Sequence, residues 1–565
     1  MIDKLRHTGA HILAQAVTEL FPKVKLGIGP TIENGFYYDF DKKENFTQED
    51  LKKIEKLMKE ISKRSLKIEK VILSRLKAKN ILKNQKYKLE ILKDLKDKNI
   101  TFYKQGEFVD LCKGPHLKST KEVKYFKILN TAGAYWKGSE KNPMLQRIYV
   151  ACFQTKQELK DYLTQLEEAK KRDHRKLGKE LELFSIHEEA PGMPFFHDKG
   201  NFILSKLTEF ITQEMRKLKY QINKTPILLN KSLWLKSGHW DHYKENMYFT
   251  KIDNKDYAIK PMNCPGNLLI FKSKLHSYKE LPIKAGEFGL VHRHELSGVL
   301  TGLFRVRVFT QDDAHIFCTK EQLEEQIIEL MSLMDKIYST FGLTYEIELS
   351  TKPEKAMGDE KIWKLAEKIL AKALKSKKIK YQLNKGSGAF YGPKIDFNIK
   401  DSMNRKWQCG TIQLDFSMPE KFDLNYEGKD GKKHRPIMLH RAIYGSLERF
   451  FGVLIEHYAG KFPLWLSPLQ VKIVTVTDKH IKFAKEIEEK LKENNIKVEL
   501  DDRNESIGKK VRDAISQKVN FILTIGDKEL KNKTLAIRSR DGKVKFGISI
   551  SKFIKDLLND INNKC

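Results

Sequence analysis

The chain has 565 residues, which at roughly 150 residues per domain predicts three or four domains. Hydrophobic residues make up 40% and charged residues 32%, a balance that supports several buried cores and excludes an intrinsically disordered chain. The formal net charge of +32 suits a polyanionic partner and argues against an acidic protein ligand or a neutral transport role. On charge alone, a lysine-rich composition that only keeps the protein soluble explains the surplus equally well.

The six cysteines are too sparse for a disulfide scaffold and fit a reducing compartment. The residues after Met1 contain no apolar signal core, and no window reaches the ~18 apolar residues of a membrane span. We therefore expect a soluble cytoplasmic protein. The cysteines are Cys112, Cys152, Cys264, Cys318, Cys409 and Cys565.

Residues 1–165 are expected to form a domain of mixed helices and strands. Apolar residues at helical spacing predict helices, and short aromatic or β-branched runs bounded by turns predict strands. In chain order these elements are a helix over 4–20, a strand over 36–40, lysine-rich helices within 48–98 and short strands within 101–150. The charged stretch 163–183 then predicts a linker helix, assigned to 166–185, although a solvated helix face carries the same charges.

The remaining two domains differ in pattern. Residues 186–465 mix strands with helices, including a strongly periodic helix over 321–340. In residues 466–565, apolar strands alternate with helices, which predicts a small α/β domain with a largely parallel sheet. Its elements are strand 471–476, helix 481–494, strand 496–500, helix 507–518 and strand 519–525. The whole chain is therefore expected to be a multidomain α+β protein.

Three segments of the middle domain contain residues that suit a nucleotide. One contains Arg293 and Glu295 and is followed by Arg305, one contains Arg449, and one is an extended segment around Pro226. Arginine forks hold phosphate oxygens at two points, which lysine cannot do. Alternation along a strand would place Arg293 and Glu295 on one sheet face, although a single Arg-x-Glu is more often a structural ion pair.

These segments resemble motifs 2, 3 and 1 of the class II aminoacyl-tRNA synthetases. The stretches PMNCPG at 261–266, RVFTQDDAHIFC at 307–318 and GAFYGPKID at 388–396 look like threonyl-tRNA synthetases, and the resemblance runs over essentially the whole chain. It implies an antiparallel class II catalytic core, an N-terminal α+β editing domain, a C-terminal α/β anticodon-binding domain and a homodimer. It also implies activation of threonine by ATP, its transfer to tRNA(Thr), and hydrolysis of mischarged Ser-tRNA(Thr).

The resemblance implies roles for several residues of the middle domain. Arg293 would hold the α-phosphate of Mg²⁺-bound ATP, Arg449 the γ-phosphate and Glu295 the adenine, with Arg305 a further nucleotide contact. His239 matches the family position for proton transfer to tRNA, and a plain pocket histidine is the alternative. Contacts to the amino acid are implied for Asp313, Gln311, Tyr391, Gln413 and Lys394.

A metal site in the same domain is implied only by the resemblance. Cys264, His315 and His440 lie too far apart for their spacing to reveal it, and a lone buried Cys or His is more often part of a core. In the family these positions hold one Zn²⁺ with an open position for threonine. A site that demands a hydroxyl rejects valine but admits serine, which predicts a second, corrective site.

Two residue pairs in the N-terminal domain indicate that corrective site. His7 and His11 lie four residues apart on one predicted helix face, and Cys112 and His116 have the same spacing. From spacing alone the set indicates zinc, whereas the resemblance implies an editing site that positions water and the seryl ester without needing a metal. Further family positions in this pocket are matched by Lys88, Tyr38 and Asp110.

The C-terminal domain offers candidate anticodon contacts. Splayed bases are read on their edges by Asn, Glu and Arg side chains, and the resemblance points to Asn504, Glu529 and Arg538. Because His7 lies so close to Met1, we expect a chain without the ubiquitin-like domain of the common family layout. Two alternatives stay open: a class II synthetase for proline or serine, and a non-catalytic RNA-binding regulator, which should have lost Arg293, Arg449 or a zinc ligand.

Overall fold

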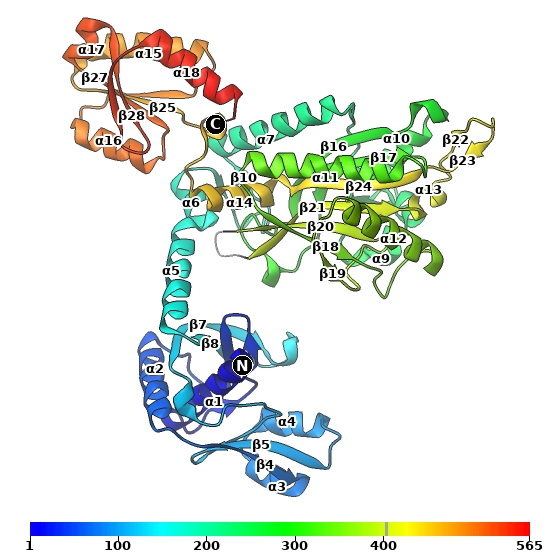
Figure 1. The fold of residues 1–565 in the computed structure, drawn as a ribbon, viewed down its shortest axis with the longest axis vertical. Coiled ribbons are helices and arrows are strands. Elements are labelled where there is room, and N and C mark those ends of the chain that lie inside the picture. Colours follow the sequence, from blue (N-terminus) through cyan, green and yellow to red (C-terminus); the bar gives the residue numbers. More distant parts are fainter. Residues whose placement is uncertain (402–404, 565) are drawn as a thin grey trace. The chain divides into compact units, whose positions relative to one another are not determined.

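A computed structural model describes residues 1–401 and 405–564, so Cys565 lies outside the described part (Figure 1). The chain divides into two compact units, Met1–Glu167 and Glu168–Cys565. Among the helices of the described residues, none is long and apolar enough to cross a membrane.

The first unit is built around helix α1 (Ile2–Leu20), whose apolar face packs on an antiparallel sheet of order β1-β3-β8-β7. Gly9 allows this close approach, because a Cβ there would lie 2.4 Å from the Phe36 ring. A second antiparallel sheet, β4-β5-β6, carries helices α3 and α4. The elements are β1 (Lys25–Leu26), β3 (Gly35–Asp41), α2 (Gln48–Lys63), β4 (Ile68–Ser74), α3 (Arg75–Ile81), α4 (Lys86–Asp94), β5 (Asn99–Gln105), β6 (Phe108–Leu111), β7 (Tyr125–Tyr135) and β8 (Met144–Phe153).

The predicted linker helix is two helices in the structure. Helix α5 (Lys156–Arg172) begins well before residue 166, and α6 (His174–Glu180) ends before residue 185. Asp173 separates them, since its side chain accepts a hydrogen bond from the backbone N–H of Arg175 (2.8 Å) and so caps α6.

The second unit contains an eight-stranded sheet of order β11-β16-β17-β24-β21-β20-β18-β19, antiparallel except at its two edge pairs. The antiparallel core predicted for this segment is therefore confirmed. Helices α7, α11, α12 and α14 bury their apolar stripes against this sheet in the largest hydrophobic cluster. The elements are α7 (Asp198–Lys217), β11 (Gln221–Ile222), α10 (Cys264–Lys272), β16 (Ile283–His292), β17 (Val308–Cys318), α11 (Leu323–Thr340), β18 (Tyr345–Ser350), α12 (Glu360–Ser376), β19 (Gln382–Asn384), β20 (Lys394–Lys400), β21 (Lys406–Asp415), β24 (Ile437–Ser446) and α14 (Leu447–Tyr458).

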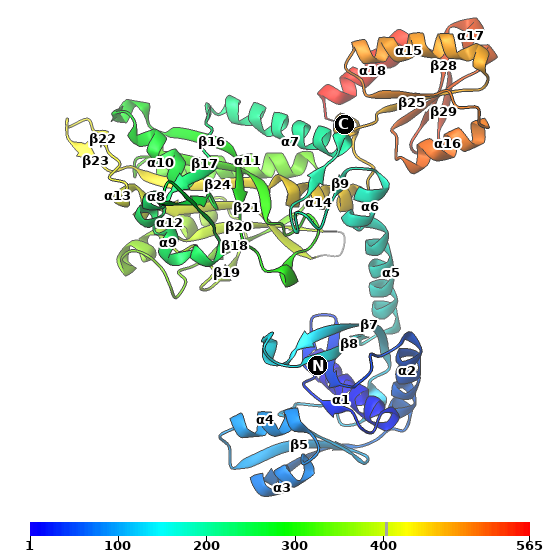
Figure 2. The ribbon, with the colours of Figure 1, turned by 180° about the vertical axis from the view of Figure 1, so that it is seen from behind.

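The C-terminal part forms a separate five-stranded sheet of order β26-β25-β27-β28-β29 (Figure 2). Strands β26, β25 and β27 are parallel, as predicted, whereas β28 and β29 add an antiparallel edge. The elements are β25 (Val471–Thr475), α15 (Ile481–Glu493), β26 (Val498–Asp501), α16 (Ile507–Ser516), β27 (Phe521–Ile525), α17 (Asp527–Asn532), β28 (Thr534–Ser539), β29 (Val544–Ser549) and α18 (Ile550–Asn562).

Candidate catalytic and editing sites

Strand register brings distant residues of the second unit together. His315 on β17 lies directly opposite His440 on β24, and His440 lies opposite Gln413 on β21. Because side chains alternate along a strand, Gln311 and Asp313 share the face of β17 that carries His315. Residues far apart in sequence therefore meet on one face of the sheet.

Cys264, His315 and His440 form a compact cluster of buried ligand atoms, all within 4.8 Å of one another. Cys264 is the first residue of α10. The Nε2 atom of His440 donates to Asp415 Oδ2 (2.9 Å), which leaves Nδ1 unprotonated. Within the described residues, both ring nitrogens of the buried His315 lack a hydrogen-bond partner.

This donor set fits a zinc ion. A buried imidazole with no partner is costly unless something binds it, and one sulfur with two nitrogens leaves an open coordination position. Burial raises the pKa of the Cys264 thiol well above its usual value, so a thiolate at this position needs a neighbouring cation.

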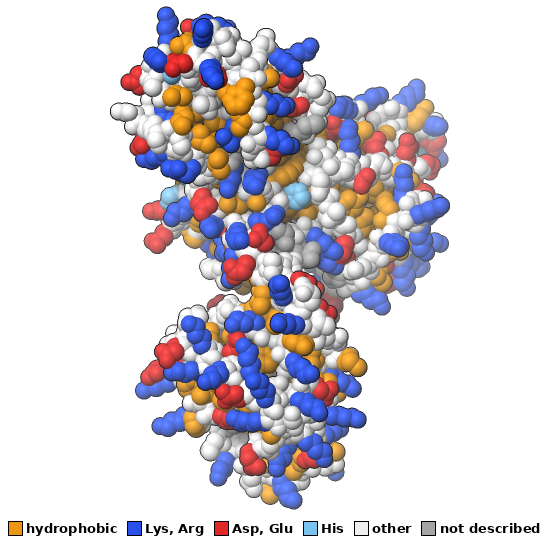
Figure 3. All heavy atoms as spheres, turned by 60° about the vertical axis from the view of Figure 1, so that its left-hand side comes forward, with side chains coloured by type: hydrophobic (Ala, Val, Ile, Leu, Met, Phe, Trp, Pro, Cys, Tyr) orange, Lys and Arg blue, Asp and Glu red, His pale blue; other side chains and the backbone are white. Residues whose placement is uncertain are grey.

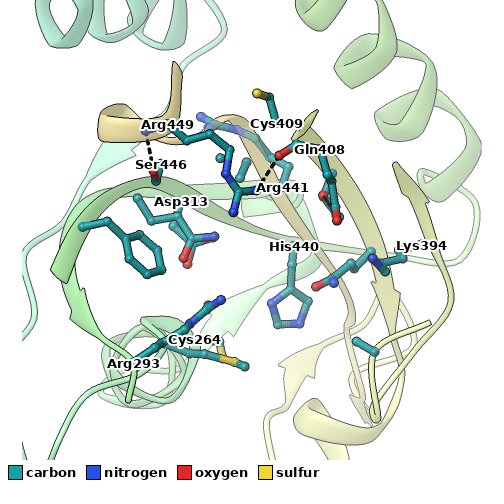
Figure 4. Close-up of a pocket in the computed structure, with 18 of the residues that line it drawn as sticks. Cys264, Arg293, Asp313, Lys394, Gln408, Cys409, His440, Arg441, Ser446 and Arg449 are labelled. Carbon is teal, nitrogen blue, oxygen red and sulfur yellow. Dashed lines mark hydrogen bonds between the residues drawn. The ribbon is translucent and has the colours of Figure 1, made fainter. Parts of the chain in front are cut away.

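A cavity of about 460 Å³ opens beside the cluster (Figure 4). Its wall includes every residue predicted to contact ATP or the amino acid, namely Arg293, Glu295, Arg305, Arg449, Gln311, Asp313, Tyr391, Lys394 and Gln413. The Tyr391 hydroxyl donates to Gln413 (2.7 Å), and Asn263 donates to Asp313 (3.2 Å). Burial raises the pKa of Asp313 to about 6.

Both predicted phosphate-binding arginines are held by backbone carbonyls. Arg293 Nε donates to Pro261 O (3.2 Å). Arg449, in the first turn of α14, donates from Nε to Phe304 O (2.9 Å) and from Nη1 to Gln408 O (2.7 Å). A guanidinium has five N–H donors, so these contacts fix the groups while leaving other donors for a ligand.

The expectation that Arg293 and Glu295 alternate along a strand is wrong. Strand β16 ends at His292, and both residues lie in the loop that follows. The backbone N–H of Glu295 bonds back to the carbonyl of Arg293 (2.8 Å), which turns the chain out of the sheet. The Glu295 carboxylate forms an ion pair with Arg305 (3.0 Å) at the cavity wall.

His239 is fully buried and does not line the cavity. Its Nδ1 lies 2.8 Å from Ser237 Oγ, and its Nε2 lies 3.1 Å from the sulfur of Met262, which does line the cavity. Burial lowers the pKa of His239 to about 3, so the ring is neutral at physiological pH.

The first unit contains a smaller cavity of about 210 Å³, lined by predicted editing residues. These are His7, His11, Tyr38, Lys88, Asp110 and Cys112. His116 lies directly behind them, because Cys112 Sγ is 3.2 Å from its Nε2 and 3.1 Å from His7 Nε2. The two pairs that the sequence suggested therefore meet in space.

The buried charged residues of this cavity form one ion pair. Lys88 Nζ lies 2.8 Å from Asp110 Oδ1, and the Tyr38 hydroxyl donates to Asp110 Oδ2 (2.5 Å). Burial lowers the pKa of His116 to about 2 and raises that of Cys112 to about 11, so both are neutral. The ligand atoms of His7, His11, Cys112 and His116 also lie within 4.8 Å of one another, so both interpretations of this set stay open.

The three candidate anticodon residues occupy different parts of the C-terminal sheet. Asn504 and Glu529 follow the ends of the parallel strands β26 and β27, and these ends share one sheet edge. Arg538 pairs with Ile522 near the beginning of β27, and so lies toward the opposite edge. Lysine and arginine side chains outnumber acidic ones on the visible face of both units (Figure 3).

Sequence reasoning missed residues that hold the predicted ones in place. Asp415 contacts His440, Asn263 contacts Asp313, and Asp396 pairs with Lys394 (2.8 Å). Alternation along β21 was a usable signal for Asp415, because it shares a strand face with Gln413.

Three protein-family models match separate regions of the chain. A model described as "tRNA synthetase class II core domain (G, H, P, S and T)" matches residues 248–458, and an "Anticodon binding domain" model matches 470–560. A "Threonyl and Alanyl tRNA synthetase second additional domain" model matches residues 100–149.

Curated relatives and solved structures agree with these matches. Threonine–tRNA ligase from Carboxydothermus hydrogenoformans is 57% identical over 565 residues, covering 100% of this chain and 89% of the relative. The ligase from Clostridium botulinum strain Langeland is 57% identical over 563 residues, covering 99% of this chain and 89% of the relative. The RNA-binding domain structure of a Cryptosporidium parvum threonyl-tRNA synthetase is 40% identical with a TM-score of 0.67, covering 68% of this chain and 98% of that one.

Proposed function

The chain belongs to the threonine–tRNA ligase family, and we propose that the larger cavity performs threonine activation and transfer while the smaller one performs editing. A class II core and an editing-type domain are both present.

In the activation step, the threonine carboxylate attacks the α-phosphate of Mg²⁺-bound ATP and pyrophosphate leaves. This reaction needs positioning and charge neutralisation more than acid–base catalysis. Arg293 is proposed to hold the α-phosphate and Arg449 the γ-phosphate, supported by their place at the cavity wall and by the carbonyls that orient them. Glu295 would read the adenine amino group and share its carboxylate with Arg305.

Threonine selection is proposed to depend on Cys264, His315 and His440 as zinc ligands. A bound zinc would supply a Lewis-acid position for the amino and hydroxyl groups of threonine, which the methyl group of valine cannot occupy. Asp313, Gln413 and Tyr391 would orient the amino acid from the same wall. His239 is kept as a proposed residue for transfer to tRNA, acting from behind Met262.

The observation that carries the synthetic proposal is the buried His315, whose two ring nitrogens lack hydrogen-bond partners within the described residues, beside a cavity with two anchored arginines. The test is ATP–pyrophosphate exchange with threonine, serine, valine and proline. We expect exchange with threonine, weaker exchange with serine and almost none with valine. Exchange that prefers proline, or well-folded protein with no threonine-dependent exchange, would overturn the proposal.

Editing is proposed to be hydrolysis of the seryl ester in the smaller cavity. Lys88, held by Asp110, would donate to the ribose hydroxyl or to the developing oxyanion. Neutral His7 and His11 would orient water, and the pocket would have to admit serine while its walls sterically refuse the methyl group of threonine. Deacylation of Ser-tRNA(Thr) by the purified chain tests this, and equal hydrolysis of Thr-tRNA(Thr) would contradict it.

Binding of tRNA, dimerisation and a cytoplasmic location are proposed from the family assignment. The anticodon-binding domain and the net charge of +32 support tRNA as the polyanionic partner. Edge strand β11 and the segment after it expose Ile222 (42%), Ile227 (41%) and Leu228 (37%), which supports a self-association surface around Pro226. Light scattering should give twice the chain mass of 66.0 kDa, and a monomer would contradict the dimer.

A further inference from the structure

His174, the first residue of α6, is a buried histidine that the reaction above does not use. Its side chain is 2% exposed. Its Nε2 accepts a hydrogen bond from the backbone N–H of Leu303 (3.0 Å), so its Nδ1 carries the proton and donates to Glu456 on α14 (2.8 Å). The ring therefore joins α6, α14 and the turn that contains Leu303.

The turn at residues 301–305 is shaped around this ring. Gly302 has a φ of +49°, and a Cβ there would lie 2.2 Å from His174 Nε2. The ring of Phe304 also packs against the His174 ring, with ring centroids 4.3 Å apart. Glycine and a buried aromatic residue thus fix the distance between His174 and the Leu303 N–H group.

A metal site is the first alternative for this cluster, because ligand atoms of Asp173, His174 and Glu456 lie within 4.8 Å of one another. However, both nitrogens of His174 already make hydrogen bonds, and Glu456 Oε2 pairs with Arg405 (3.3 Å). These candidate ligand atoms therefore already have partners in the protein, whereas the ring nitrogens of His315 have no hydrogen-bond partner within the described residues.

The same turn supports two proposed ATP contacts. The carbonyl of Phe304, next to Leu303, accepts the hydrogen bond from Arg449 Nε (2.9 Å). Arg305, the following residue, lines the cavity and pairs with Glu295 (3.0 Å). A shift of the Leu303 backbone would therefore move both Arg305 and the carbonyl that orients Arg449.

We propose that His174 is a positioning residue for ATP: by accepting the Leu303 N–H, it holds the 301–305 turn so that Arg305 and Arg449 meet the nucleotide. This inference rests on the proposed roles of those two arginines. It predicts a defect in ATP binding and not in threonine binding, because no residue of the turn belongs to the Cys264, His315 and His440 cluster.

Two substitutions separate the contacts of His174. In His174→Gln, the side-chain oxygen can accept from Leu303 N–H, whereas the shorter side chain of His174→Asn can donate to Glu456 but falls short of Leu303. Glu456→Gln keeps an acceptor for Nδ1–H. His187→Asn, at an exposed histidine of the same unit, is the matched control.

The assay is threonine-dependent pyrophosphate exchange with the full chain, with the thermal unfolding temperature as the check that the second unit, which contains His174, is folded in each variant. We expect His174→Asn to raise the KM for ATP about tenfold while the KM for threonine stays within about twofold. His174→Gln and Glu456→Gln should stay within about threefold of wild type for ATP. If His174 only filled space, glutamine and asparagine would raise the KM for ATP alike. A near wild-type KM for ATP in His174→Gln alone therefore indicates the hydrogen bond to Leu303.

Four results would overturn the inference. Equal effects of Asn and Gln at position 174, or equal rises in both KM values, would reduce His174 to a packing residue. A Glu456→Gln defect as large as that of His174→Asn would place the effect in α14 and not in the turn. Wild-type protein without threonine-dependent exchange would overturn the proposed function as well, and so distinguishes the two failures.

Discussion

Replacing Asp415 by asparagine should weaken zinc binding by about 10- to 100-fold. Asp415 is fully buried, and its two oxygens accept three hydrogen bonds. Oδ2 accepts from His440 Nε2 (2.9 Å), while Oδ1 accepts from the backbone N–H groups of Ser417 (2.8 Å) and Met418 (3.0 Å). An asparagine has one oxygen and one N–H₂ group, so it can satisfy only one of these two sides.

Either orientation of the asparagine side chain harms the site. If its oxygen faces the backbone, its N–H₂ group faces His440 and favours the tautomer with a proton on Nδ1, which removes that nitrogen as a ligand. If its oxygen faces His440, two buried N–H groups lose their acceptor. The loss of one charge-assisted hydrogen bond, about 1.5–3 kcal/mol, corresponds to the predicted fold-change.

Zinc affinity is best measured by competition with a chromophoric chelator on the full chain. Asp430→Asn is the control, because Asp430 pairs with His434 (2.9 Å) on the surface and outside the cavity. Valine-dependent pyrophosphate exchange should rise in Asp415→Asn and stay unchanged in the control. Wild-type zinc affinity in a folded Asp415→Asn protein would refute the reasoning.

Three further predictions concern Arg449, His11 and Glu448. Arg449→Lys should lower kcat/KM for ATP by about 10- to 100-fold, because lysine cannot make both carbonyl contacts and still reach a phosphate, and an unchanged value would argue against the γ-phosphate role. His11→Ala should leave threonine charging intact but let Ser-tRNA(Thr) accumulate, and undiminished deacylation would count against the editing assignment. Burial raises the pKa of Glu448 to about 7, above the ~4.3 of an unfolded glutamate. The protonated carboxyl group therefore stabilises the fold at low pH, and this stabilisation is lost as the pH rises from about 4.3 through about 7. Glu448→Gln should therefore flatten the fall of the unfolding temperature between about pH 4 and pH 7, whereas equal slopes would contradict this.

The family resemblance, and not strand alternation, identified the residues of the larger cavity. Strand alternation explains, once the bounds of β17 are known, why Gln311, Asp313 and His315 share one face. It failed at Arg293 and Glu295, because the end of a strand is set by tertiary contacts and not by alternation.

Other features of the site depend on tertiary packing, which no local sequence pattern predicts. The meeting of Cys264 with His315 and His440 follows from the sheet order and from where α10 begins, so it could come only from the family resemblance. The position of His239 behind Met262 depends on burial of the ring, which a short motif does not encode. In contrast, Asp173 is a recognisable helix-capping residue, and it could have located the break between α5 and α6.

The central claim is that a zinc ion held by Cys264, His315 and His440 distinguishes threonine from valine. Zinc content measured on the wild-type chain, Cys264→Ser and Cys112→Ser tests it most directly, since the second cysteine belongs to the other cluster of possible ligands. We predict about one zinc per wild-type chain, loss in Cys264→Ser and no change in Cys112→Ser. Full zinc content in Cys264→Ser, or zinc-free wild-type protein that still selects threonine over valine, would contradict the account.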